Sequence, residues 1–125
     1  MTRARSGAVV FAASPKQLAE FYAVTTGLPV IHADEEHVVL ASGSFELVIH
    51  QMHGGTPVQG PPTPRRDTAI KPFFVVASLA VVREKAAAMG GRLEPVQKEW
   101  SARGFRACEA VDPEGNVIQF REEAE

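Results

Sequence analysis

Residues 8–27 read AVVFAASPKQLAEFYAVTTG, a short apolar run followed by a helical pattern and a glycine. The apolar positions after the run recur at the spacing of one helix face: Leu18, Phe21, Tyr22 and Thr25. Ser14 suits an N-cap and Pro15 the first helical position, where its missing N–H costs nothing. Gly27 supplies the left-handed residue that commonly ends a helix. The stretch predicts a strand followed by a helix.

The same order returns in residues 73–91, FFVVASLAVVREKAAAMGG. Ser78 stands where a second N-cap is needed, and a second apolar stripe follows it: Leu79, Val82, Ala86 and Met89. The pairs Ser14/Ser78 and Gly27/Gly91 are both 64 positions apart. A matched strand, cap, helix length and stop at one offset indicates a duplicated βα unit.

Short extended segments follow each predicted helix, so each half has the order βαβββ. In the first half they are residues 30–31, 37–41 and 45–52, and in the second half 92–96, 105–111 and 117–121. We expect module one at about 5–53 and module two at about 69–122. The Pro- and Gly-rich residues 54–68 between them suppress helix and ladder hydrogen bonding and predict a linker. Modules of about 60 residues form a core more easily together than alone, so we expect a single domain over residues 1–125.

Composition and charge exclude several functions. Thirteen Lys plus Arg against fifteen Asp plus Glu leave no basic excess for nucleic acid. The apolar runs are too short to span a bilayer, and no signal-peptide core follows the first residues, so we expect a cytoplasmic protein with no membrane partner. Cys108 is the single cysteine, which excludes an internal disulfide. We expect it to be a buried strand residue.

The C-terminal residues 111–121, VDPEGNVIQFR, read as a tight turn and an alternating strand. Together with the duplicated modules they resemble the vicinal oxygen chelate superfamily, which includes glyoxalases, bleomycin resistance proteins and extradiol dioxygenases. Glu20-Phe21-Tyr22 and Thr26-Gly27-Leu28-Pro29 are similar to the first helix of that superfamily and its exit turn. The resemblance implies an α+β fold in which two βαβββ modules form curved sheets around a cup-shaped pocket.

In enzymes of the superfamily, His or Glu residues from four strands hold a divalent metal. Matching this chain to that pattern places Gly7, Lys71 and Gln119 at three of the four positions. Glycine has no ligating side chain, an ammonium repels a cation, and an amide is a weak ligand. Only Glu46 remains a normal ligand type. We therefore expect neither the usual metal site nor any cofactor, and a protein that is more a binding protein than an enzyme.

Other side chains could still bind a ligand. Glu46 and His50 alternate with apolar residues on one strand and should face the pocket, as should Gln119 and Arg121 on another. Trp100 lies in a polar stretch, where its ring could stack on a planar molecule or cover the end of the core. Arg106 could supply charge to an anionic ligand. We expect the ligand-binding residues to be these six: Glu46, His50, Trp100, Arg106, Gln119 and Arg121.

These observations lead to two hypotheses. The first is a metal-independent small-molecule binding protein of the bleomycin-resistance type, which sequesters an apolar or aromatic ligand and could serve antibiotic resistance; the resemblance implies a homodimer. The second is a metal-dependent glyoxalase-like lyase, isomerase or dioxygenase. Its rearranged site, built on Glu46, His50 and His53, would hold nickel, zinc, iron or manganese. His32 and His37, beside Asp34, are expected to be solvated. A module that binds only another protein stays open.

Overall fold

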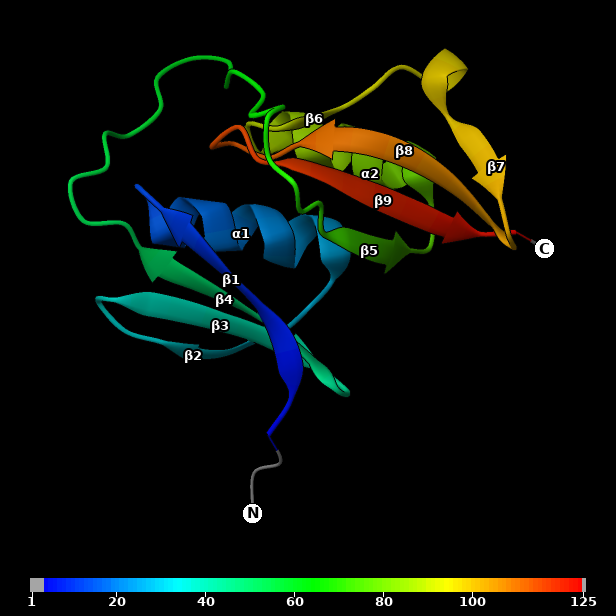
Figure 1. Cartoon of the computed structure of the whole chain (residues 1–125). Helices are drawn as coiled ribbons and strands as arrows, with labels where there is room; N and C mark the ends of the chain where they lie inside the picture. Colours follow the sequence, from blue (N-terminus) through cyan, green and yellow to red (C-terminus); the bar gives the residue numbers. More distant parts are fainter. Residues whose placement is uncertain (1–3, 125) are drawn as a thin grey trace. The chain divides into compact units, whose positions relative to one another are not determined.

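A computed structural model of the chain describes residues 4–124. The residues form two compact units, the first ending at Pro57 and the second beginning at Val58. The boundary lies inside the segment that the sequence predicts as a linker. Each unit contains one α-helix and one mixed sheet (Figure 1).

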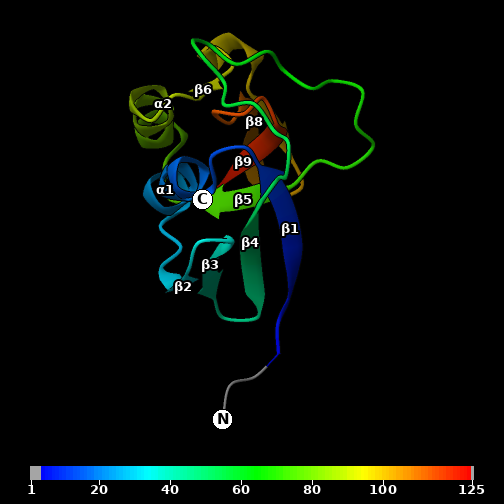
Figure 2. The same ribbon diagram turned by 90° about the vertical axis from the view of Figure 1, so that its left-hand side faces the viewer.

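The first unit has the order βαβββ. Its elements are β1 (Ser6–Ala12), α1 (Pro15–Thr26), β2 (Val30–Ala33), β3 (His37–Ser42) and β4 (Phe45–Gln51). The strands lie in the order β1-β4-β3-β2, which can be followed across the sheet in Figure 2. β1 runs parallel to β4, whereas β3 is antiparallel to both β4 and β2. The predicted first module is therefore present.

One face of this sheet is covered by α1, which contacts β1, β3 and β4. The predicted stripe is buried: Leu18, Phe21, Tyr22 and Thr25. Leu47 and Ile49 of β4 are fully buried on the helix side of the sheet. The helix ends at Gly27, which has the predicted left-handed conformation with φ 77°. The face of each sheet opposite its helix is called the open face below.

The second unit repeats the order and adds a short strand. Its elements are β5 (Phe73–Val76), α2 (Leu79–Ala88), β6 (Arg92–Leu93), a 3₁₀ turn (Val96–Lys98), β7 (Trp100–Ala102), β8 (Phe105–Val111) and β9 (Val117–Glu123). The strand order is β5-β9-β8-β6, with β7 also paired to β8. β5 and β9 are parallel, and β8 is antiparallel to β6, β7 and β9. The sequence did not predict β7, because three residues are too short a run for an alternating pattern to be recognised.

Predicted features of the second unit are confirmed in detail. Ser78 Oγ accepts a hydrogen bond from Val81 N at 3.2 Å, as an N-cap should. In the first unit the corresponding prediction was wrong, because the side chain of Ser14 at the start of α1 makes no capping hydrogen bond.

Two other predictions concern strand β8 and the turn that follows it. Cys108 is fully buried. The buried carboxylate of Asp112 accepts hydrogen bonds from the backbone of Glu114 (2.9 Å) and of Asn116 (3.0 Å), which fixes the predicted turn.

The predicted linker is only partly a free connection. Arg65 N donates to Gly115 O at 2.8 Å, and Arg92 donates to the carbonyl of Pro62 at 3.4 Å. A Cβ at Gly115 would lie 2.4 Å from Thr63 O, so the segment packs closely on the turn before β9. Residues 62–65 therefore belong structurally to the second unit. Composition could not show this, since these contacts use backbone atoms.

Among the described residues, neither helix is long and apolar enough to cross a membrane.

Candidate functional site

Position 7 cannot hold a metal-ligating side chain. Gly7 lies on the open face of β1, opposite Glu46 in the parallel ladder. A Cβ added at Gly7 would lie 1.8 Å from the carbonyl oxygen of Glu46 and 2.8 Å from its carbonyl carbon. Backbone in a sheet cannot move aside as a flexible side chain can. The residue is therefore glycine because two strands approach closely here, and any ligand type would collide.

The other two altered positions are engaged with neighbouring side chains. Lys71 Nζ lies 2.9 Å from Glu109 Oε1, and Arg66 Nη1 donates to the other oxygen of that carboxylate at 3.0 Å. Arg121 Nε donates to Gln119 Oε1 at 2.5 Å. An ion at these positions would face an ammonium and an amide whose oxygen is already bonded. The residues of this chain do not fit the metal of the family's enzymes.

The alternative metal set is not brought together. Glu46 and His50 share the open face of β4 but are four residues apart, or about 13 Å along a strand. Glu46 Oε1 lies 3.9 Å from Arg5 Nη1. His50 Nδ1 lies 2.9 Å from the carbonyl oxygen of Gln51. His53 is 82% exposed and its nearest carboxylate is that of Glu36, at 3.9 Å. One ion cannot be shared by these three side chains.

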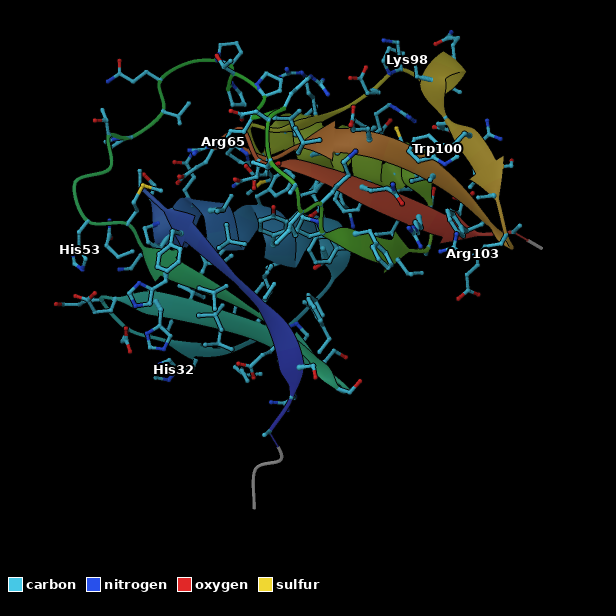
Figure 3. The ribbon with its side chains drawn as sticks, in the orientation of Figure 1. His32, His53, Arg65, Lys98, Trp100 and Arg103 are labelled. Carbon is cyan, nitrogen blue, oxygen red and sulfur yellow. The ribbon has the colours of Figure 1, made fainter. Side chains whose placement is uncertain are left out.

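Trp100 lies on the open face of the second unit and lines a pocket of about 310 Å³. It is opposite Ala107 in the ladder between β7 and β8, and 40% of it is exposed. The pocket is lined by Trp100 and four charged residues: Arg66, Glu94, Lys98 and Glu109. Figure 3 labels Trp100 on β7 and Lys98 just before it. Of the two roles predicted for Trp100, the structure therefore favours the pocket over the core.

Ion pairs join the charged groups of this pocket. Arg66 contacts Glu94 (3.5 Å) and Glu109 (3.0 Å), and Lys98 contacts Glu94 (3.8 Å). Burial alone would raise the pKa of Glu109, but hydrogen bonds from Lys71 and Arg66 outweigh it and hold that pKa below its ordinary value. The pocket thus presents carboxylates and cations beside one aromatic ring.

Arg121 and Gln119 lie on the same open face. The Arg121 guanidinium lies over the ring of Phe73 at 3.6 Å and over that of Phe105 at 4.2 Å. Gln119 is opposite Glu109 in the ladder, so it lies one strand from the Trp100 pocket. Arg121 is fixed by two aromatic rings and by its hydrogen bond to the Gln119 side-chain oxygen. Because that oxygen is engaged, Gln119 would contact a ligand through its side-chain nitrogen, which is a hydrogen-bond donor.

Arg106 is separated from this group. It is opposite Glu122 in the ladder, and Glu122 Oε1 accepts a hydrogen bond from Leu79 N of α2, so both lie on the helix face. Arg106 Nε donates to Glu99 Oε1 at 2.6 Å, and Arg83 of α2 donates to the second oxygen at 2.5 Å. Glu99, the residue before β7, thus joins Arg106 of β8 to Arg83 of α2 on the helix face. The structure places it apart from Trp100, Gln119 and Arg121.

The Glu99 carboxylate is the centre of this second cluster. Burial would raise its pKa, but Arg106 and Arg83 outweigh that effect and lower it. Burial raises the pKa of the Cys108 thiol, against the opposing charge of Arg83. Cys108 is therefore a protonated core residue, as the sequence indicates.

One cluster was not anticipated. His32 Nε2 lies 2.8 Å from Asp34 Oδ2, and His37 Nδ1 lies 3.1 Å from Asp34 Oδ1. The two rings are 4.9 Å apart. Both histidines are exposed in part, as expected, but each also contacts the carboxylate of Asp34, which the sequence analysis did not predict. The spacing His-x-Asp-x-x-His across a tight turn was the signal available in the sequence.

Comparisons with known proteins agree with the fold. Residues 7–120 match the glyoxalase-like domain family. No curated protein matches significantly. A solved glyoxalase/bleomycin resistance protein/dioxygenase family enzyme from Burkholderia phytofirmans PsJN is similar, with TM-score 0.71, 15% identity, and coverage of 98% of this chain and 100% of that one.

Two other solved structures show the breadth of the fold. A glyoxalase/bleomycin resistance protein from Albidiferax ferrireducens T118 has TM-score 0.70 and 18% identity, covering 95% of this chain and 98% of that one. The fosfomycin resistance protein FosX from Mesorhizobium loti has TM-score 0.67 and 10% identity, covering 99% and 95%. At these identities the likeness concerns the fold alone. The two βαβββ units and the match over residues 7–120 lead to one conclusion: the chain belongs to the glyoxalase-like domain family of the vicinal oxygen chelate superfamily.

Proposed function

We propose that the protein binds a small, flat aromatic molecule without a metal, in the manner of a bleomycin-resistance protein. The observation that carries the proposal is Gly7, whose added Cβ would lie 1.8 Å from Glu46 O. A chain that cannot place a ligand there lacks the first element of the family's catalytic centre. Lys71 and Gln119, already bonded to Glu109 and Arg121, support the same conclusion.

The Trp100 pocket is where the ligand binds under this proposal. A volume of about 310 Å³ suits a small molecule. The indole ring offers a stacking surface, and the charged groups around it offer hydrogen bonds to polar groups at the edge of a ring system. Gln119, on the adjacent strand, adds an amide donor. The ligand class is therefore aromatic with polar substituents.

A binding experiment tests this proposal, because the chain has a single tryptophan. A panel of small, flat aromatic antibiotics is titrated into chelator-treated protein while Trp100 fluorescence is recorded. Fosfomycin, which has no aromatic ring, serves as the comparison compound. We expect saturable quenching by at least one aromatic compound and none by fosfomycin. If no aromatic compound binds up to millimolar concentration, the proposal is overturned.

Calorimetry with variants locates the site. Trp100→Ala should abolish binding of the compound found in the panel. Ile70→Ala is the matched control, because Ile70 is an apolar side chain of the same unit that is 81% exposed and lies outside the pocket. Equal loss of binding in both variants would argue against the Trp100 pocket.

The geometry does not favour a metal-dependent enzyme built on Glu46, His50 and His53, since these side chains lie apart. A homodimer, which the resemblance implies, stays a prediction that sedimentation equilibrium can measure. A cytoplasmic location also stays a prediction.

A further inference from the structure

We propose that His32, Asp34 and His37 form a binding site for one divalent transition-metal ion, with Zn²⁺ as the ion of reference. The site lies on the hairpin of β2 and β3 in the first unit. It uses none of the four positions that the family's enzymes use for their metal, and it does not depend on the ligand proposed above.

A β-bulge brings the two histidines to one face. Val30 pairs with Leu40, so regular pairing would place His32 opposite Val38, whose side chain is buried on the helix side. The register instead shifts between Val30 and His32, and His32 pairs with Val39. Val39 shares the open face with His37, since the two alternate along β3. The extra residue in β2 therefore turns His32 toward His37, which is the usual effect of a bulge beside a site.

The turn then places Asp34 between the two rings. Asp34 N donates to His37 O at 3.0 Å, which closes the hairpin. Asp34 Oδ1 accepts hydrogen bonds from the backbone N–H of Glu36 (2.8 Å) and of His37 (2.9 Å), so the carboxylate is fixed by its own turn. A carboxylate that the backbone already orients loses little freedom when it binds an ion.

The donor set and its spacing suit a borderline divalent ion. Among residues 4–124, these are the only three or more His, Cys, Asp or Glu side chains whose ligand atoms gather within 4.8 Å of one another. Two imidazoles and one carboxylate are a common protein set for Zn²⁺, at about 2.0–2.2 Å from the metal. Donors on a tetrahedral ion are then somewhat over 3 Å apart. The observed contacts, at 2.8 Å and 3.1 Å, go to different oxygens of Asp34, and one ligand atom from each residue lies within 4.8 Å of the others. The side chains must therefore rotate to place one carboxylate oxygen and both ring nitrogens on the same ion.

Hydrogen bonding to His32, and then to the backbone of Glu36 and His37, lowers the pKa of Asp34 far below its ordinary value. The cluster is also accessible, with the His32 side chain 52% exposed and that of Asp34 44% exposed.

A pocket adjoins the proposed site. Asp34 is part of the wall of a cavity of about 320 Å³, together with Ser14, Lys16, Gln17 and Gln51 among others. Three protein ligands leave a fourth position of a tetrahedral ion open. Water would complete the coordination.

The competing explanation is that the cluster only clamps the hairpin through hydrogen bonds. The two explanations predict different results when a histidine is replaced. If the cluster is only a clamp, replacing a histidine changes the stability of the first unit but does not change the affinity of the protein for metal. A metal site loses affinity for the ion even where stability is unchanged.

The experiment is a calorimetric titration of Zn²⁺ into the full chain, purified without a histidine tag and dialysed against chelator. We expect one equivalent to bind. Glutamine replaces one histidine at a time in His32→Gln and His37→Gln, and His53→Gln is the matched control because its side chain is 82% exposed and outside the cluster. Each cluster variant should lower the affinity by at least about tenfold, whereas the control should not.

A second measurement keeps the test independent of folding. Co²⁺ gives intense visible absorption when its site is tetrahedral, and this band should appear in the parent protein and in His53→Gln but not in His32→Gln. Thermal unfolding of each variant without metal shows whether the fold is kept. The proposal is overturned if Zn²⁺ does not bind, if folded His32→Gln retains full affinity, or if His53→Gln loses as much as the cluster variants.

Discussion

Replacing Gly7 by alanine tests why the first strand has no room for a ligand. In Gly7→Ala the new Cβ would start 1.8 Å from Glu46 O, about half of a normal non-bonded separation of roughly 3.5 Å. Glu46 cannot retreat, because it is paired with Gly7 on one side and with Ala41 of β3 on the other. The start of β1 must therefore move away from β4.

The expected cost combines overpacking and lost ladder bonds. Overpacking a tight site costs about 1–3 kcal/mol, and each weakened backbone hydrogen bond adds about 1 kcal/mol. We expect Gly7→Ala to lower the free energy of unfolding by about 3 kcal/mol, which corresponds to a fall in Tm of about 10 °C or more.

Urea unfolding followed by circular dichroism measures this change. Val9→Ala is the control, because Val9 lies two residues along the same strand with 56% exposure. Val9→Ala should change the free energy of unfolding by about 0.5 kcal/mol, as substitutions at other surface positions do. If Gly7→Ala unfolds at the same urea concentration as the parent with the same m-value, a side chain fits at position 7 and the steric reasoning fails.

Three further predictions concern the second unit. Asp112→Ala should lower stability by about 3 kcal/mol, because it removes the fully buried acceptor of the turn before β9; a change below that of the Val9 control in urea would contradict this. Glu109 has a pKa lowered below 4.5, so it stabilises the fold above that pH and loses this contribution as the pH falls through its lowered value. Glu109→Gln should flatten the acid limb of a plot of stability against pH, and an unchanged limb would count against the ion pairs with Lys71 and Arg66. Arg121→Leu should cost about 1–2 kcal/mol through lost stacking on Phe73 and Phe105, measured against Arg103→Leu, whose guanidinium lies 5.3 Å from the centre of one ring only.

The local patterns of the sequence were sufficient for most of the fold. Helix stripes, glycine stops and the Asp112 turn depend on residues close in sequence, and α1 and β8 follow the predicted pattern closely. The absence of a ligand at Gly7 was also evident from its residue type. Only the structure shows that the position tolerates no side chain, because the clash involves Glu46, far along the chain.

The remaining features depend on strand register, that is, on which residues of neighbouring strands are opposite each other. The alternation of apolar and polar residues in the sequence does not give this register. Arg106 was grouped with Gln119 and Arg121, but its pairing with Glu122 puts it on the other face of the sheet. The cluster of His32, Asp34 and His37 depends on a bulge between Val30 and His32, which no propensity marks. A one-residue shift in pairing changes the face of a side chain, so such sites are hidden until the ladder is known.

The most direct test of the proposed function is the binding of the panel's aromatic compound with and without metal. Calorimetry is run on chelator-treated protein and on protein supplemented with Mn²⁺, Ni²⁺ or Zn²⁺, in both the parent and His32→Gln, so that an ion at the hairpin is accounted for. Equal affinity under all conditions, abolished by Trp100→Ala, is the result that we predict. Binding that appears only with metal, in His32→Gln as well as in the parent, would contradict a metal-independent site.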